Sequence, residues 1–326
     1  MADRKIKMYP VTETFGIKAP KEAVVPGFEP DPNAPAAHLV PAVDPNHVFP
    51  KDFLRDILAW WRGTHEGFVK KEGFFCFGPK GSGKSSGILQ VAARLNIPVF
   101  RDCGSEVYDV EAAIAHPTVI GGDTMMADGP MTMAARIGAW FLLDEVDQIE
   151  PSNQVGFNPI AEGSSWALPR TGEVITPHPN FRFFATGNSN FGGDATGLYQ
   201  GVKRQNSAFG DRWFITKMDY IDPESEKAIL KNAVPGITDV QVEGMVKFAN
   251  MIRSIFRGEE SGQAPIEIEL STRSLVRWAV NTAMFQNTEC PIVYAMDRAF
   301  GFGCDPETRD VLVETLQRVF GKEVTK

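Results

Sequence analysis

The stretch of sequence that decides the fold spans residues 78–86 and reads Gly78-Pro79-Lys80-Gly81-Ser82-Gly83-Lys84-Ser85-Ser86. It contains the complete pattern GxxxxGK[ST], which is typical of a loop that binds phosphate groups. The glycines allow the backbone to curl until successive N–H groups converge on phosphate oxygens. In this pattern Lys84 reaches the β- and γ-phosphates of a nucleotide, and the Ser85 hydroxyl is a ligand of Mg²⁺. All residues of the stretch are therefore candidates for binding ATP.

The residues on either side place this loop between a strand and a helix. The apolar run Gly73–Phe77 comes before it, and a helix is predicted from about Lys84 to Leu95. The N-terminus of that helix adds the positive end of its dipole to the phosphate site. This context distinguishes the stretch from a mere glycine-rich turn.

Two acidic residues follow a second buried strand. Residues 140–143 are apolar, and Asp144 and Glu145 come directly after them. Open α/β sheets bind ligands at the carboxyl ends of their strands, so we expect Asp144 beside the phosphate loop, where it holds the hydration shell of Mg²⁺. Glu145 is the predicted general base, which orients or deprotonates the attacking water.

A third strand, residues 181–186, leads to the polar residue Asn188. An amide at a strand tip beside the γ-phosphate can position the water that attacks it. Taken alone, an asparagine that serves a turn would explain the pattern as well. Because the two preceding motifs point to the same sheet edge, we predict that Asn188 is a nucleotide sensor.

The order of short apolar strands and helices predicts an α/β fold with a doubly wound parallel sheet, covered by helices on both faces. From Asp222 onward the pattern is helical, which predicts a compact second domain. Residues 1–50 contain nine of the 23 prolines. Proline removes backbone donors and blocks helices, so an extended arm is predicted there. The expected organisation is an arm over 1–50, a nucleotide-binding domain over 51–221 and a helical lid domain over 222–326.

Composition excludes several classes of protein. A hydrophobic content of 43% supports a real core, and no apolar run is long enough to span a bilayer. The net charge of −8 argues against a broad nucleic-acid footprint. The four cysteines form no CxxC pair, and the five histidines lack metal-ligand spacing, so we expect reduced cysteines, a cytoplasmic location and no structural zinc.

Together these motifs resemble the AAA+ ATPases of the MoxR-like branch, and within it the ATPase subunit of aerobic cobaltochelatase. The resemblance covers roughly residues 12–300. Besides the phosphate loop, it rests on Thr14-Phe15-Gly16-Ile17, Asp44-Pro45, Asp128-Gly129-Pro130, Leu142-Leu143-Asp144-Glu145-Val146-Asp147, His178–Asn188, Thr196–Gly201 and Asp211-Arg212-Trp213.

The resemblance assigns two further arginines. Arg212 is similar to the arginine finger, which points into the nucleotide site of the adjacent subunit and stabilises charge on the transferring phosphate. A surface arginine that caps a helix is the alternative, and Lys203 and Arg204 are rival fingers that do not follow an Asp-Arg pattern. Arg273 is similar to the sensor-2 arginine, which contacts the γ-phosphate of its own subunit. The family often has proline where this chain has Thr272.

Residues 121–138 contain four of the eleven methionines, at positions 125, 126, 131 and 133. In MoxR-like proteins an insertion here faces the ring pore or a partner, and flexible methionine suits a surface that grips varied shapes. Ordinary core packing is the alternative. By the same resemblance, residues 153–172 form a helix and a β-hairpin on that ring face.

The resemblance implies a head-to-tail hexameric ring that couples ATP hydrolysis to remodelling of a partner protein, one with a von Willebrand A-type domain. One alternative is a cobaltochelatase subunit proper, acting in cobalamin biosynthesis. A nucleic-acid motor is disfavoured by the net acidity. A scaffold that binds ATP but barely hydrolyses it is disfavoured by Glu145 and Arg212.

Overall fold

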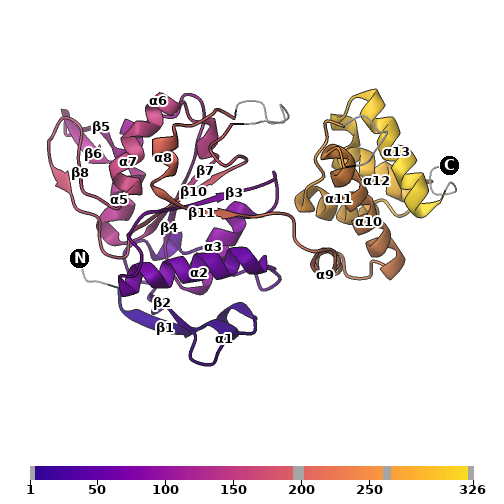
Figure 1. Cartoon of the computed structure of the whole chain (residues 1–326), viewed down its shortest axis with the longest axis horizontal. Coiled ribbons are helices and arrows are strands. Elements are labelled where there is room, and N and C mark those ends of the chain that lie inside the picture. The colour runs from indigo at the N-terminus through magenta and orange to yellow at the C-terminus, as the bar shows by residue number, and fades with distance from the viewer. Residues whose placement is uncertain (1–3, 194–201, 260–265, 322–326) are drawn as a thin grey trace. The chain divides into compact units, whose positions relative to one another are not determined.

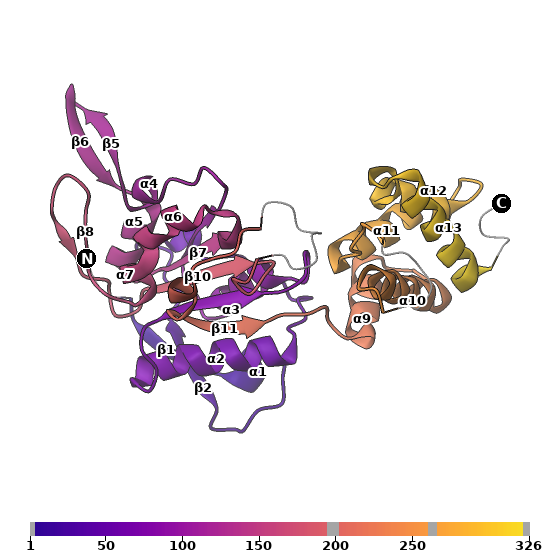
Figure 2. The same ribbon diagram turned by 45° about the horizontal axis from the view of Figure 1, so that its top comes forward.

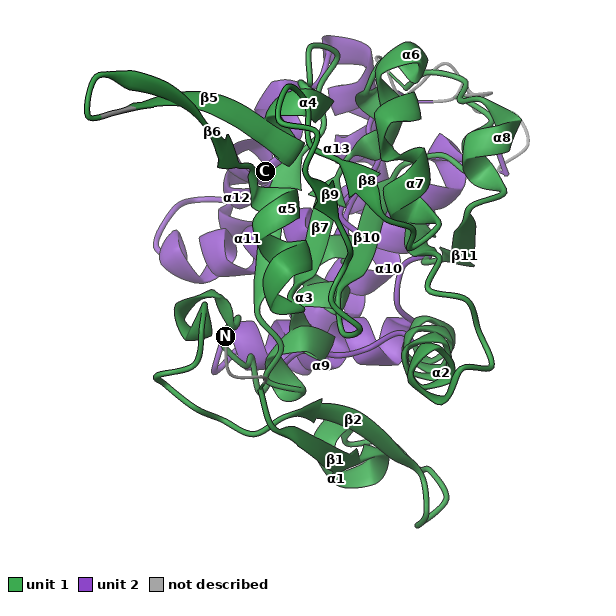
Figure 3. Ribbon diagram, turned by 90° about the vertical axis from the view of Figure 1, so that its left-hand side faces the viewer, with its two compact units in different colours: residues 1–45, 51–78, 83–218 green, residues 46–50, 79–82, 219–326 purple. Residues whose placement is uncertain are grey.

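The computed structural model describes residues 4–193, 202–259 and 266–321. The chain divides into two compact units, which are coloured separately in Figure 3. Unit 1 comprises residues 1–45, 51–78 and 83–218, and unit 2 comprises residues 46–50, 79–82 and 219–326. The phosphate-loop segment 79–82 thus groups with the C-terminal residues, although the expected domain boundaries place the whole loop in the α/β domain.

Unit 1 is built on a five-stranded sheet in which every neighbouring pair of strands is parallel (Figure 1). In spatial order the strands are β11 (Trp213–Lys217), β3 (Gly73–Phe77), β10 (Arg182–Gly187), β7 (Trp140–Asp144) and β4 (Val99–Cys103). The first of these strands in the chain, β3, lies inside the sheet, so later strands extend it in both directions. The predicted doubly wound parallel sheet is confirmed.

The side chains of successive strand residues point to opposite faces of the sheet, and both sets include buried residues. On one face, Phe74 and Phe184 contact Phe53 and Trp60 of helix α2 (Lys51–Glu66). The other face contributes Phe75, Phe141 and Phe183 to a core that also includes residues of α5 and α7. Since both faces are covered, the strands read as apolar runs rather than as alternating patterns.

Helices and two small hairpins fill the connections between the strands. The helices are α3 (Lys84–Arg94), α4 (Val110–Ile114), α5 (Pro130–Ile137), η2 (Val146–Gln148), α6 (Pro151–Gln154), η3 (Val155–Phe157), α7 (Asn158–Ala161) and α8 (Ser207–Gly210). The hairpins pair β5 (Ala115–Ile120) with β6 (Asp123–Asp128), and β8 (Trp166–Ala167) with β9 (Val174–Ile175). The β5–β6 hairpin projects from the rest of unit 1 (Figure 2).

The methionine-rich segment contains both buried and exposed methionines. Met131 is fully buried in the core through α5, whereas Met125 on β6 is 53% exposed. Met133 is also exposed, and Met126 packs partly against the core. Core packing therefore explains Met131, whereas the role of the exposed methionines in facing a pore or a partner stays a prediction.

The N-terminal segment differs from an extended arm. It contains β1 (Ile6–Pro10), α1 (Val11–Phe15), β2 (Val24–Phe28) and η1 (Ala37–Leu39). The indole N–H of Trp61 donates to Pro26 O at 2.7 Å, and Phe28 N donates to Leu95 O at 2.9 Å. A two-stranded ribbon tolerates proline because much of its backbone lies at an edge, so these prolines do not prevent strand pairing.

Unit 2 is helical, as predicted for the C-terminal region. Its helices are α9 (Pro223–Ala233), α10 (Asp239–Phe256), α11 (Thr272–Met284), α12 (Pro291–Ala299), η4 (Gly301–Gly303) and α13 (Pro306–Phe320). Side chains of Asp222, Thr238, Ser271 and Asp305 cap four of the helix N-termini. Apolar faces of these helices meet around Phe248 and Trp278. Within the described residues, no helix combines the length and apolarity needed to cross a membrane.

Candidate nucleotide-binding site

Lys84 opens helix α3 directly after the phosphate loop and is buried. Its ammonium group donates to Gly78 O at 2.7 Å and to Asn188 Oδ1 at 3.1 Å. Gly78 has φ +152°, and a Cβ there would lie 1.8 Å from Met218 O, so this position accepts only glycine. The close approach lets the loop turn sharply out of β3 and presents Lys84 at the carboxyl edge of the sheet.

Asn188 follows β10 and is held by a buried acid that the sequence reasoning left without a role. Asp147 Oδ2 accepts hydrogen bonds from the backbone N–H groups of Asn188, at 2.6 Å, and Ser189, at 3.0 Å. Burial raises the pKa of the Asp147 carboxyl, and these two hydrogen bonds oppose the rise. The only sequence signal for Asp147 is its place three residues after Asp144 in the acidic motif.

Asp144 lies at the end of β7, where three hydroxyl or guanidinium groups converge on its carboxylate. Its Oδ1 accepts from the Ser85 hydroxyl and, at 2.9 Å, from the Thr186 hydroxyl. Its Oδ2 accepts from Arg101 Nε at 2.6 Å. The predicted pair of magnesium ligands, Ser85 and Asp144, is therefore in direct contact.

The donor set suits Mg²⁺, which prefers oxygen ligands and is usually held by one or two protein groups together with phosphates and water. Ser85 and Asp144 provide a hydroxyl and a carboxylate oxygen at one point. Among the residues that the structure describes, no three His, Cys, Asp or Glu side chains form a metal cluster. An ion at this site would therefore take its remaining ligands from the nucleotide and from water.

Arg101 and Thr186 are site residues that sequence reasoning missed. Thr186 belongs to β10, and its hydroxyl also accepts from Glu145 N at 3.3 Å. Arg101 lies on the edge strand β4, and its side chain is 56% exposed. Nothing in the local pattern separates Arg101 from a surface arginine, because its partner lies 43 residues further along the chain.

Glu145 adopts a left-handed backbone conformation with φ +56°. This region is sparsely populated by residues other than glycine and is often found at functional sites. Its carboxylate accepts a hydrogen bond from Gln148 Nε2 at 2.6 Å. The conformation ends β7 abruptly and turns the chain into η2, while Asp144 stays on the strand.

Arg212 follows α8, and its hydrogen-bond partners differ from those of Lys84. Its Nε donates to Glu162 Oε1 at 2.5 Å, and its Nη1 donates to Ala208 O. The side chain lines a cavity of about 650 Å³ together with Lys70, Glu72, Glu162, Ser164, Ala208 and Asp211. The rival Lys203 is bound to Glu106, at 2.9 Å, and to Glu150.

The other predicted nucleotide-binding residues are divided between the two units. The Ser86 hydroxyl donates to Gly83 O at 2.9 Å, within unit 1. In unit 2, Ser82 N donates to Pro79 O at 3.3 Å, and the Lys80 carbonyl accepts from the Tyr220 hydroxyl at 3.1 Å. Gly81 has φ +71°. Arg273 is exposed on the first turn of α11.

Comparison with known families gives two adjacent matches. The AAA domain of the dynein-related subfamily matches residues 73–212, and the C-terminal region of CbbQ, NirQ and NorQ matches residues 226–319. The chain belongs to the MoxR-like branch of the AAA+ family. This membership agrees with the resemblance carried by the motifs, and an AAA domain implies nucleotide binding.

Three relatives of this MoxR-like protein differ in how much of each chain the similarity covers. Aerobic cobaltochelatase subunit CobS of Sinorhizobium sp is 30% identical over 96% of this chain and 91% of its own length. Protein NorQ of Paracoccus denitrificans is 28% identical over 67% of this chain and 76% of its own length. Midasin of Giardia intestinalis is 29% identical over 48% of this chain, but only 3% of midasin is covered.

Proposed function

We propose that this protein is an ATP hydrolase that works as a ring and uses ATP turnover to remodel or activate a partner protein. The observation that carries the proposal is the meeting of three motifs at one sheet edge. Lys84 contacts Asn188, and Ser85 contacts Asp144. These contacts join a phosphate-binding loop, a magnesium ligand and a polar sensor, which are the parts that phosphoryl transfer to water requires.

Each residue has a distinct task in the proposed reaction. Lys84 binds the terminal phosphates, while Ser85 and Asp144 hold Mg²⁺, which when bound neutralises phosphate charge. Glu145 accepts the proton of the attacking water, and Asn188 orients that water toward the γ-phosphorus. Lys84 and Asn188 then keep the γ-phosphate and the water in line, so that catalysis is mainly positioning and electrostatic stabilisation.

The ring and the partner extend this proposal. Arg212 would complete the nucleotide site of the neighbouring subunit, and a contact that repeats head to tail closes into a ring, for which a hexamer is proposed. The family resemblance suggests a partner with a von Willebrand A-type domain. A second candidate is a chelatase subunit, because the similarity to the cobaltochelatase subunit extends over nearly the whole of both chains.

The deciding experiment compares ATP turnover by wild type, Glu145→Gln and Lys84→Ala. Wild type should hydrolyse Mg·ATP, Glu145→Gln should bind it without turnover and accumulate as a ring in analytical ultracentrifugation, and Lys84→Ala should not bind it. Equal, very slow turnover by wild type and Glu145→Gln would instead indicate a scaffold. Strong stimulation of the wild type by DNA at physiological salt would favour a nucleic-acid motor.

A further inference from the structure

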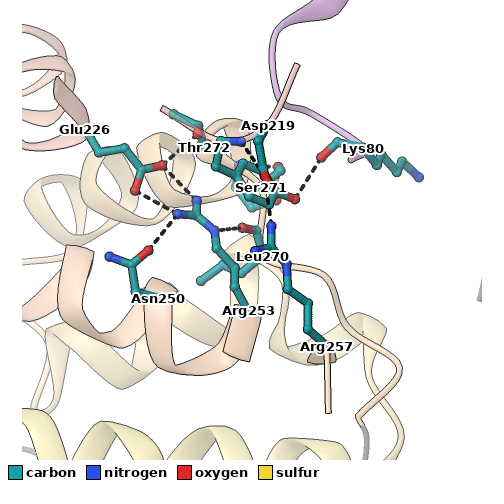
Figure 4. Close-up of polar contacts among 11 residues, drawn as sticks. Lys80, Asp219, Glu226, Asn250, Arg253, Arg257, Leu270, Ser271 and Thr272 are labelled. Atoms are coloured by element: carbon teal, nitrogen blue, oxygen red, sulfur yellow. Dashed lines mark hydrogen bonds and ion pairs between the residues drawn. The ribbon is translucent and has the colours of Figure 1, made fainter. Parts of the chain in front are cut away.

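A buried ion pair inside unit 2 carries an inference that rests on the proposed function. Glu226 on α9 is 0% exposed, and Arg253 on α10 is 5% exposed. Two hydrogen bonds of 2.8 Å join the guanidinium group to both carboxylate oxygens (Figure 4). Removing two charges from water is costly, and an apolar pair of similar volume is often equally stable or more stable. Helix packing alone therefore does not explain this pair.

Of the hydrogen bonds that remain, one stays within α10 and two reach the start of α11. Arg253 Nε donates to Leu270 O at 2.8 Å, and Arg253 Nη1 also donates to Asn250 Oδ1 at 3.1 Å. Glu226 Oε1 accepts from the Thr272 hydroxyl at 2.7 Å. Leu270 and Thr272 flank Ser271, the N-cap of α11, so the ion pair holds the start of that helix from both sides.

The same guanidinium group supports Tyr220, near the start of the C-terminal segment of unit 2. The carbon Cζ of Arg253 lies 4.0 Å from the centre of the Tyr220 ring, a distance typical of a cation–π contact. The Tyr220 hydroxyl donates to Lys80 O at 3.1 Å. A single buried arginine thus contacts both the entrance of α11 and the residue that binds the phosphate-loop segment 79–82.

The loop segment touches the helix entrance directly as well. A Cβ at Gly81 would lie 2.4 Å from Ser271 Cβ, so no larger residue fits unless one backbone shifts. The segment 79–82 is therefore held by Tyr220 at Lys80 and by Ser271 at Gly81. Lys84, the proposed phosphate-binding lysine, follows the segment by two residues in the chain.

We propose that Tyr220, Arg253 and Glu226 are positioning residues that fix the phosphate-loop segment 79–82 against the N-terminus of α11. Their joint effect is to keep the loop in the curled form that accepts phosphate, and to align the first turn of α11, which carries Arg273. Loss of this support would weaken nucleotide binding while leaving the chemical step intact.

The sharpest test is Tyr220→Phe in the full-length chain, because it removes one hydroxyl and keeps the ring beside Arg253. The dissociation constant of Mg·ADP, measured by calorimetric titration, should rise about three- to tenfold, which corresponds to the loss of one hydrogen bond. The KM for ATP should rise in parallel, with kcat unchanged. The melting temperature should stay at the wild-type value, because the Tyr220–Lys80 hydrogen bond is exposed.

Tyr294→Phe provides a matched control in the same unit. Tyr294 also lies against an arginine, with Arg298 Cζ 3.2 Å from its ring centre, and its hydroxyl has no hydrogen-bond partner among the described residues. This variant should bind Mg·ADP as wild type does. If Tyr220→Phe and Tyr294→Phe both bind like a wild type that hydrolyses ATP, the positioning role is wrong and the proposed function stands. If wild type binds no nucleotide, both proposals fail.

The double variant Glu226→Leu/Arg253→Met tests the ion pair itself. It keeps the volume but removes the charges, so it should fold with a melting temperature close to that of wild type. Its affinity for Mg·ADP should fall at least as far as that of Tyr220→Phe. Adding Tyr220→Phe to it should cause no further loss, because the support for the tyrosine is already gone. A folded double variant with wild-type affinity would refute the role of the pair.

Discussion

The ammonium group of Lys84 lies 3.1 Å from the side-chain oxygen of Asn188, although 104 residues separate them in the chain. The contact exists because β3 and β10 are neighbours in the sheet, with Gly187 paired to Phe77 at the ends of the two strands. The loop that follows one strand therefore meets the tip of the other. A phosphate bound by Lys84 would lie within reach of the Asn188 amide.

Asn188→Ala should lower kcat for ATP hydrolysis about 10²-fold, since the attacking water loses the group that positions it. The dissociation constant of Mg·ADP should change little, because Lys84 keeps its contact with Gly78. Steady-state turnover and equilibrium titration measure the two quantities. Asn190→Ala, a variant of an exposed residue in the same turn, is the control and should retain wild-type turnover. An unchanged kcat in Asn188→Ala would remove Asn188 from the mechanism.

Arg101→Gln should lower the Mg²⁺ concentration that half-saturates ATP-dependent turnover, by about two- to fivefold. The guanidinium group binds one carboxylate oxygen of Asp144 and repels a cation at that oxygen. The shift is small because a partly exposed ion pair contributes only modestly to the electrostatic free energy of the site. A Mg²⁺ titration at fixed ATP measures the shift. Arg55→Gln, which removes an exposed arginine of α2 that pairs with Asp52, serves as a charge-matched control. A higher Mg²⁺ requirement in Arg101→Gln would mean that Arg101 helps to hold the metal site together.

Arg212→Ala should reduce ATP hydrolysis by about 10³-fold or more and leave nucleotide affinity intact, as expected for an arginine finger. Mixed assemblies with Lys84→Ala subunits should recover part of the activity, at sites where an intact finger meets an intact phosphate loop. Lys203→Ala, a variant of the rival residue, should retain turnover. Absence of recovery at every mixing ratio would argue against action across a subunit interface.

The stability of unit 1 should fall as the pH drops below the ordinary histidine pKa of 6.5. Burial, and next the charge of Arg182, lower the pKa of His65, so the unfolded chain binds a proton at a pH where the folded protein does not. The stabilisation is complete above pH 6.5 and is lost progressively toward the lower folded-state pKa. Melting temperatures at pH 7.5 and 5.5 should differ less in His65→Gln than in wild type. An identical difference would assign the pH dependence to other groups.

Local patterns point to the parts of the candidate site that are contiguous in sequence. The phosphate loop and the acidic pair Asp144–Glu145 combine a fixed spacing with a preceding apolar run, and short-range geometry makes that combination recognisable. Asp147, Arg101 and Thr186 were missed as site residues because their partners come from other strands. The prediction of an extended arm over residues 1–50 is wrong. A high proline content disfavours helices, but it does not show whether a segment pairs with another strand.

The amino-acid order therefore specifies a parallel α/β unit with a phosphate loop, followed by helices, because turn chemistry and apolar periodicity are local properties. Strand order, by contrast, depends on long-range packing, and it places Asn188 beside Lys84 and Arg101 on Asp144. Which charges pair also depends on the tertiary structure. In the sequence, Glu226 and Arg253 look like ordinary helix residues. They form a buried ion pair only because three helices enclose them. Sequence spacing cannot predict such contacts, because the residues lie far apart in the chain and come together only in the folded structure.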